Sequence, residues 1–158
     1  MGSQQNFIHA VASRDLVRPR VAGIIIRRGY LLVQRPAGDP SSCYAFPGGE
    51  YEVGDTFETR MAAEIDEETT ACMVSAEYLF VVENRFNFEG KLIQGLEHFI
   101  AVEIDRDDVT SCEDHLCFHW LPIDRLSEYD LRPHVARDAV ASGDYLRVKH
   151  LQVPLAES

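Results

Sequence analysis

Runs of β-branched and aromatic residues, separated by turn residues, dominate the pattern of hydrophobic and polar positions along the chain. Arg28-Gly29 separates two such runs and is typical of a tight hairpin turn. A second set of turn residues, at 87–90, separates two longer segments in which apolar and polar residues alternate. The pattern predicts strands over 21–26, 30–34, 73–82, 92–104 and 115–122.

One segment has helical periodicity instead. Met61 and Ile65 lie one helical turn apart and predict an amphipathic helix over 56–69. Asp55 or Thr56 is suited to cap this helix, since either side chain accepts hydrogen bonds from free N–H groups of the first turn.

Proline and glycine mark a second helix. Pro133 suits a first helical position and Gly143 a helix end, which predicts a helix over 133–142. The remaining predictions are a loosely ordered arm or edge strand over 1–19, a loop over 36–42, a short helical turn over 124–128 and a last strand over 145–153.

The order of these elements is strands, helix, strands, helix. Such an order predicts an α/β fold with a mixed β-sheet and helices on both faces. The chain shows no internal repeat and no linker, so we expect a single domain over 1–158 with its core at about 20–142.

Composition narrows the possible partners. Hydrophobic residues make up 46% of the 158 positions, as in globular chains with a packed core. The formal net charge of −11 argues against binding to nucleic acid, because phosphate backbones need a basic surface. A small phosphorylated substrate stays compatible with this charge, since a bound cation bridges two anions. The four cysteines form no Cys-x-x-Cys pair and no apolar run reaches 18 residues, so we expect a cytoplasmic protein without membrane contact.

Three glutamates stand out for their spacing. Glu64, Glu67 and Glu68 share one face of the predicted helix, because residues at i, i+3 and i+4 are neighbours. Their mutual repulsion costs stability, and Mg²⁺ or Mn²⁺, which take oxygen ligands, would offset it. Gly48 and Gly49 add open backbone just before the helix, an arrangement suited to chemistry on phosphate anhydrides. The alternative is a solvated acidic helix face.

The segment 49–71 resembles the signature box of the Nudix hydrolases, which reads G-x5-E-x7-R-E-U-x-E-E-x-G-U, where U is a bulky aliphatic residue. The matching positions are Gly49, Glu64, Ile65, Glu67 and Glu68. The departures are Asp55 for Glu, Ala63 for Arg, Thr70 for Gly and Ala71 for the last aliphatic residue. The resemblance implies an α/β/α sandwich and a hydrolase that uses Mg²⁺ or Mn²⁺.

The resemblance also assigns roles to single residues. It implies that Glu64, Glu67 and Glu68 bind the metal, and that Gly48 and Gly49 let the backbone approach the substrate. It further implies a substrate-facing guanidinium at Arg35, for which a surface charge is the alternative. Either Glu67 or Glu97 is the expected general base. Glu97 is also a candidate fourth ligand, with a solvent-facing strand residue or the same role for Glu83 as alternatives.

The family's arginine that pairs with the helix carboxylates is replaced by Ala63, so another residue must take over this role. Arg60 lies on the glutamate face and we expect it to orient Glu64, unless it is an exposed arginine beside a weakened site. We also assign an orienting role to Asp55, which is one methylene shorter than the family's glutamate.

The expected function is hydrolysis of pyrophosphate bonds in nucleoside diphosphate-linked compounds or nucleoside triphosphates. The alternative is a Nudix-fold domain that senses nucleotides without turnover, an interpretation that Ala63 and Thr70 motivate. The resemblance leaves a homodimer as an expectation. The sequence does not identify the substrate, because the downstream marker residues of the known substrate groups are absent.

Overall fold

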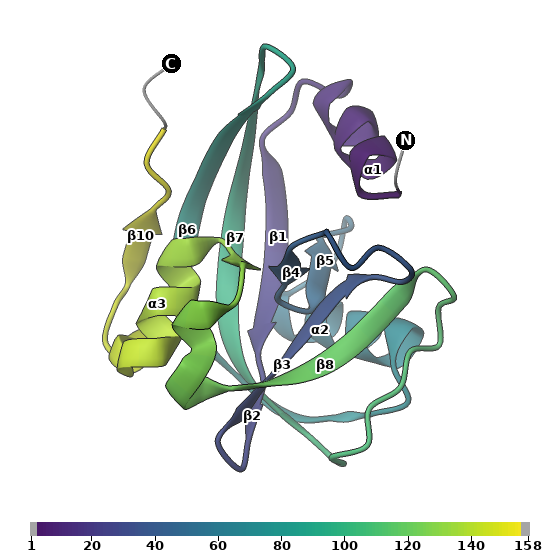
Figure 1. The fold of residues 1–158 in the computed structure, drawn as a ribbon, viewed down its shortest axis with the longest axis vertical. Coiled ribbons are helices and arrows are strands. Elements are labelled where there is room, and N and C mark those ends of the chain that lie inside the picture. Colours follow the sequence, from purple (N-terminus) through teal and green to yellow (C-terminus); the bar gives the residue numbers. More distant parts are fainter. Residues whose placement is uncertain (1–2, 156–158) are drawn as a thin grey trace.

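The computed structural model describes residues 3–155, with α-helices and strands along the whole of this range (Figure 1). In chain order the elements are α1 (Ser3–Ala12), β1 (Arg18–Ile24), β2 (Ile26–Arg27), β3 (Tyr30–Pro36), β4 (Tyr44–Ala45), β5 (Gly48–Glu50), α2 (Phe57–Glu68), β6 (Met73–Phe88), β7 (Lys91–Ile104), β8 (Leu116–Pro122), a 3-10 helix (Ile123–Glu128), β9 (Leu131–Arg132), α3 (His134–Ser142), a second 3-10 helix (Asp144–Leu146) and β10 (His150–Gln152).

The strands form two sheets. The first has the order β10-β6-β7-β1-β5, and the second has the order β2-β3-β4-β9 with β8 paired to β3. Both are mixed: β1 is parallel to β7 but antiparallel to β5, and β4 is parallel to β9 but antiparallel to β3. The parallel register places Arg20 opposite Glu97.

Alternation along β1 builds two cores. Val21 packs with Met61 and Ile65 of α2 in one cluster, whereas Ala22 packs with Val140 of α3 in the other. Because successive strand residues point to opposite faces, α2 and α3 cover opposite sides of the strands. The predicted α/β/α sandwich with mixed sheet pairing is confirmed (Figure 1).

The predicted arm over 1–19 is wrong where the structure describes it. Ser3–Ala12 forms the helix α1, and β1 begins at Arg18. The strand starts this early because β7 pairs with it along its whole length, from Arg18 to Ile24, and β5 joins from Arg20. Likewise β6 continues past its predicted end at residue 82 to Phe88, since the neighbouring β7 completes its hydrogen bonds. Only three residues, His150–Gln152, form the expected last strand.

The two predicted helices are confirmed within one residue at their starts. Thr56, and not Asp55, caps α2: the Thr56 hydroxyl accepts a hydrogen bond from Thr59 N, and the Thr59 hydroxyl accepts one from Thr56 N. Asp55 instead accepts a hydrogen bond from Glu52 N at 2.8 Å. Gly143 ends α3 with a positive φ of 83°, a conformation that glycine adopts without a steric penalty.

Candidate active site

The three glutamates lie in the C-terminal half of α2, and the last turn of this helix contains no basic residue. The C-terminal end of a helix is the negative end of its dipole, so carboxylates there add to an already negative potential. Burial first, and then the charge of Glu64, raises the pKa of Glu68 to about 8. Burial and the charge of Glu67 raise the pKa of Glu64, against the opposing effect of Arg60. This end of the helix therefore attracts protons or cations.

The structure brings Glu64 and Glu68 together but leaves Glu67 apart. The two carboxyls are close enough to share a hydrogen bond, whereas the Glu67 side chain is 62% exposed. Within residues 3–155, no three His, Cys, Asp or Glu side chains are grouped to hold a metal ion. The Glu64–Glu68 pair still fits a divalent cation, because its oxygen donors are of the kind that Mg²⁺ and Mn²⁺ prefer. Burial first, and then neighbouring carboxylate charges, raise both pKa values, and a cation would relieve this repulsion.

Arg60 occupies the centre of this acidic region. Its side chain is 5% exposed, and Nε lies 3.4 Å from Glu64 Oε1 while Nη2 lies 3.6 Å from Glu67 Oε1. Nη1 contacts Glu52 Oε1 at 3.1 Å and Asp55 Oδ2 at 3.5 Å. Burial lowers the pKa of Arg60, but the surrounding carboxylates more than offset this and raise it. The guanidinium thus lies among the helix carboxylates although position 63 holds alanine.

Close contacts surround Gly48 and Gly49, with backbone at the first position and with a side chain at the second. A Cβ on Gly49 would lie 2.1 Å from Glu64 Oε1, and a Cβ on Gly48 would lie 1.9 Å from the carbonyl oxygen of Val21. Both distances are shorter than real Cβ contacts. At Gly48 the strand β5 therefore approaches β1 more closely than a side chain would allow, whereas a side chain at position 49 would displace the Glu64 carboxylate.

The C-terminal end of α2 is held by threonine side chains. Thr69 adopts an extended conformation; its hydroxyl donates to Ile65 O at 2.8 Å and accepts from Ala71 N at 3.0 Å. Thr70, which replaces the family's glycine, exchanges backbone and side-chain hydrogen bonds with Thr110. The helix therefore ends without a left-handed residue.

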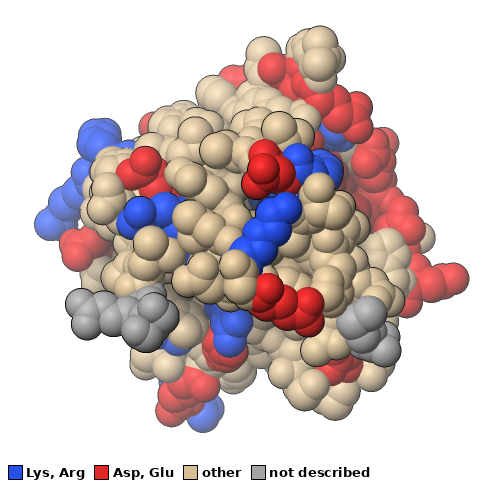
Figure 2. Space-filling model, turned by 90° about the horizontal axis from the view of Figure 1, so that it is seen from above, with Lys and Arg blue, Asp and Glu red and all other residues tan. Residues whose placement is uncertain are grey.

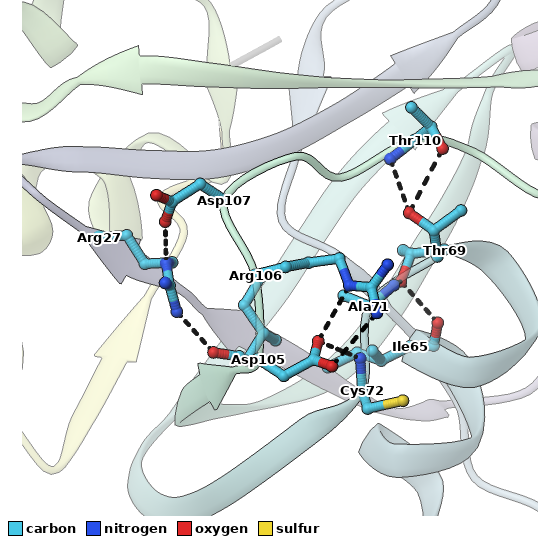
Figure 3. Close-up of polar contacts among 11 residues, drawn as sticks. Arg27, Ile65, Thr69, Ala71, Cys72, Asp105, Arg106, Asp107 and Thr110 are labelled. Atoms are coloured by element: carbon cyan, nitrogen blue, oxygen red, sulfur yellow. Dashed lines mark hydrogen bonds and ion pairs between the residues drawn. The ribbon is translucent and has the colours of Figure 1, made fainter.

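The loop over 105–112 completes this end of α2 (Figure 3). Cys112 N donates to the Glu68 carbonyl at 2.8 Å, and Asp105 accepts from Cys72 N at 2.8 Å. Arg27 joins the loop to β2 through an ion pair with Asp107. These contacts fix the backbone that carries Glu68.

A cavity of about 360 Å³ is lined by five of the predicted site residues, whereas Glu67, Glu97, Arg60 and Asp55 are not among its lining residues. Glu64 and Glu68 form part of its wall, together with Gly48 and Gly49 of β5 and the side chains of Arg18, Arg20 and Arg35. The lining residues are Gln4, Phe7, Arg18, Arg20, Gln34, Arg35, Pro36, Cys43, Ala45, Gly48, Gly49, Glu50, Glu64, Glu68, His115 and Leu116. The cavity wall therefore offers guanidinium groups to an anionic ligand and carboxylates to a cation.

The comparison with known families decides what kind of site this is. A family model described as the NUDIX domain matches residues 16–142, a range that includes the glutamates, the glycines and Arg35. The chain belongs to the NUDIX family. This membership supports a pyrophosphohydrolase type of function on a small nucleotide-like substrate, and divalent metal ions are the general cofactors of Nudix hydrolases.

Solved structures share this Nudix fold at low sequence identity. A MutT NUDIX hydrolase from Burkholderia pseudomallei is 21% identical, with a TM-score of 0.60 over 80% of this chain and 97% of that chain. A MutT protein from Methanosarcina mazei Go1 is 19% identical, with a TM-score of 0.64 over 81% of this chain and 93% of that chain. A MutT protein from Bacillus halodurans is 17% identical, with a TM-score of 0.65 over 85% and 86%. A search of the curated proteins finds no significant match.

Two residues assigned from the Nudix resemblance have contacts that the sequence did not show. Arg35 lines the cavity, and its guanidinium lies over the ring of Tyr44 at 4.9 Å. Glu97 is not among the lining residues; it is 6% exposed and accepts a hydrogen bond from Arg20 Nη1 at 2.9 Å. Its position therefore supports a role in holding Arg20 more than direct contact with a ligand.

Sequence reasoning missed two arginines of the Nudix cavity. Arg18 and Arg20 alternate on β1 and both line the cavity, Arg18 with an exposed fraction of 8%. Their i, i+2 spacing just before an apolar strand is the signal that could have identified them. Arg18 lies in the range predicted as an arm or edge strand, and Arg20 lies one residue before the predicted strand 21–26. Glu50 lies 3.3 Å from Arg18 Nε and also accepts hydrogen bonds from Arg14.

Acidic side chains accompany the basic ones elsewhere on the surface. Figure 2, seen from the end where α1 lies in Figure 1, shows Lys and Arg side chains beside Asp and Glu side chains, with other residues between the basic groups.

Of the helices in the described range, none has both the length and the apolar character that a membrane span requires.

Proposed function

We propose that this Nudix protein is a hydrolase dependent on Mg²⁺ or Mn²⁺ that cleaves pyrophosphate bonds in nucleoside diphosphate-linked compounds or nucleoside triphosphates. One observation carries the proposal: the Glu64–Glu68 pair lines the same cavity as Arg18, Arg20 and Arg35. A pyrophosphate substrate needs both kinds of group, because cations must balance its charge while water attacks one phosphorus and the bridging P–O bond breaks.

Glu64 and Glu68 would hold the cation, and the exposed Glu67 would join them by a change of side-chain rotamer. When bound, the metal neutralises charge on the pyrophosphate and lowers the pKa of an attacking water. Glu67 is our candidate for the base that takes the proton of this water. The water oxygen bonds to one phosphorus, the bridging P–O bond breaks, and the products are a nucleotide and a phosphorylated remainder.

The remaining side chains of the site position these groups. Arg60, held by Asp55 at 3.5 Å, fixes Glu64 in place of the arginine that the family has at position 63. Arg35 and Arg20 would bind phosphate oxygens, since planar guanidinium groups match phosphate geometry. Glu97 keeps Arg20 oriented through their 2.9 Å ion pair.

The test is a hydrolysis screen with Mg²⁺ and with Mn²⁺ over nucleoside triphosphates, nucleotide sugars, ADP-ribose and dinucleotides. The variants Glu64→Gln, Glu67→Gln and Glu68→Gln should each lower turnover by at least 100-fold, because removing charge stabilisation costs several kcal/mol at the transition state. Asp138→Asn, a carboxylate on α3 that pairs with Arg137, is the matched control and should keep full turnover.

Each outcome of the screen has a definite meaning. Turnover that disappears in the glutamate variants supports the hydrolase and identifies its substrate class. Metal-dependent nucleotide binding without turnover would replace the proposal by the sensor function. Cytoplasmic location and a homodimer stay predictions, and light scattering of the purified protein tests the second.

A further inference from the structure

The helix α1 adds a wall to the candidate active site from outside the conserved domain. The match to the NUDIX domain begins at residue 16, whereas Gln4 and Phe7, both on α1, line the same cavity as Glu64 and Glu68. The site therefore contains side chains that the domain by itself would not supply.

Contacts at both ends hold α1 over the cavity, on the side of β5 shown in Figure 1. Near the start of α1, Gln4 Nε2 donates a hydrogen bond to Sγ of Cys43, in the loop before β4, at 3.2 Å. Near its end, the ring of His9 meets the edge of the Phe88 ring at 5.0 Å, at the tip of the β6–β7 hairpin. Val11 is buried, with an exposed fraction of 7%.

The segment that follows α1 is also tied to the cavity wall. Arg14 donates two hydrogen bonds, of 3.0 and 2.9 Å, to the carboxylate of Glu50, a lining residue on β5. The helix is thus fixed to β5, to the β6–β7 hairpin and to the loop before β4, and its cavity-facing side chains have defined places.

Phe7 is the aromatic side chain that α1 presents to the cavity. Its residue is 54% exposed, and the guanidinium of Arg18 lies 5.3 Å from the centre of its ring. Arg18 is itself buried, with an exposed fraction of 8%. The cation–π contact sets the orientation of the ring and leaves about half of the residue open to a ligand.

We propose that Phe7, backed by Arg18, is the surface on which the base of a nucleotide stacks, so that α1 selects nucleoside-containing substrates over pyrophosphates without a base. The inference rests on the proposed function for the position of the phosphates, near Glu64 and Glu68. Aromatic rings bind bases through their faces, and loss of such a ring typically weakens binding about tenfold or more.

Binding without turnover is the first test. In the Phe7→Trp variant, indole fluorescence reports on a ligand at this position, and the wild-type protein, with Trp120 alone, is the reference. The metal-free variant is titrated with AMP and with ribose 5-phosphate. We expect quenching by AMP at a concentration at least tenfold lower than any effect of ribose 5-phosphate. Equal responses to the two ligands, or none, would overturn the inference.

Kinetics provide the second test, on whichever nucleotide substrate the protein hydrolyses. Phe7→Ala should raise KM about tenfold with kcat within twofold, Phe7→Tyr should restore the wild-type KM, and hydrolysis of inorganic tripolyphosphate should not change. Gln5→Ala, an exposed position on α1 outside the cavity lining, is the control and should behave as wild type. Hydrolysis with the same KM in Phe7→Ala removes the inference alone, whereas AMP-selective binding without any hydrolysis removes the proposed function and keeps the inference.

Discussion

The helices α2 and α3 cover opposite faces of the same strands, yet they end in different ways. Gly143 ends α3 in the left-handed conformation, so the stop is encoded by one local residue. Thr69 ends α2 in an extended conformation, and the carbonyl of Glu68 is bonded by Cys112, more than 40 residues along the chain. The end of α3 is a local property, whereas the end of α2 depends on tertiary contacts.

The charged side chains of α2 and α3 also differ in how far their placement depends on the rest of the fold. On α3, the exposed Asp138 pairs with its half-buried neighbour Arg137. On α2, Glu64 and Glu68 are held together with raised pKa values, and the nearest guanidinium, that of Arg60, is almost completely buried. The helix α3 completes the core and places its carboxylate in solvent. The helix α2 carries the candidate site, and its clustered carboxylates are held in place by contacts with other parts of the fold.

Substituting Gly49, which contacts Glu64 of α2, and Gly143, which ends α3, should give the largest difference in activity between the two regions. In Gly49→Ala the new Cβ, 2.1 Å from Glu64 Oε1, must displace this carboxylate, and we expect kcat/KM to fall at least 100-fold. In Gly143→Ala the Cβ meets no atom within 4 Å, but the positive φ costs roughly 1 kcal/mol, so stability falls and turnover stays. Thermal unfolding and initial rates of both variants decide it; comparable turnover in the two would contradict the comparison.

Substituting one arginine of each helix, Arg60 of α2 and Arg137 of α3, should give a smaller difference in turnover than the glycine variants. Arg60→Ala removes the guanidinium that contacts Glu64 at 3.4 Å, and metal-dependent turnover should drop at least tenfold. Arg137→Ala on α3 removes a surface pair and a hydrogen bond to Tyr129 O, with no effect on turnover. Adding Ala63→Arg to Arg60→Ala restores the family's position and should recover part of the rate. Unchanged turnover in Arg60→Ala would remove the orienting role.

Metal-free protein should become less stable with rising pH because of Glu68. Its folded pKa of about 8 lies above the ordinary value of 4.5, so the stability gained by keeping the proton is present below pH 4.5 and is lost as pH rises through 8. Allowing for solvent screening, the loss is roughly 2 kcal/mol, or about 5 °C in Tm. Glu68→Gln cannot ionise, so in EDTA its Tm should gain on wild type between pH 5 and 8.5. A constant difference in Tm between Glu68→Gln and wild type over this range would show that the pKa of Glu68 is not raised.

The threonine cap should have the smallest effect. Thr69→Val leaves Ala71 N without its acceptor in a buried position, which should cost about 1.5 kcal/mol in unfolding free energy. Thr70→Val loses exposed contacts to Thr110, so its cost should be clearly smaller. Urea unfolding of the two variants measures both, and an equal cost would indicate that burial of Thr69 does not matter.

Local patterns predicted much of the fold. The hairpin turn at Arg28–Gly29, the strands and the starts of α2 and α3 follow from turn residues, alternation and capping, which act between near neighbours. The helix α1 was missed because its apolar stripe is weak, and contacts such as the one between His9 and Phe88 hold it in place. Of the predicted site residues, Glu64, Glu68, Gly48, Gly49 and Arg35 line one cavity, whereas Glu67 and Glu97 do not.

The sequence by itself determined the family, the face of α2 that carries the glutamates and the presence of Arg60 on that face, since helical spacing alone fixes which residues are neighbours. Only the tertiary structure decided that Glu67 lies apart from Glu64 and Glu68, that Glu97 holds Arg20, and that α1 brings Phe7 to the cavity. These facts depend on the register of β1 against β7 and on packing between distant segments, and no local pattern encodes such long-range distances.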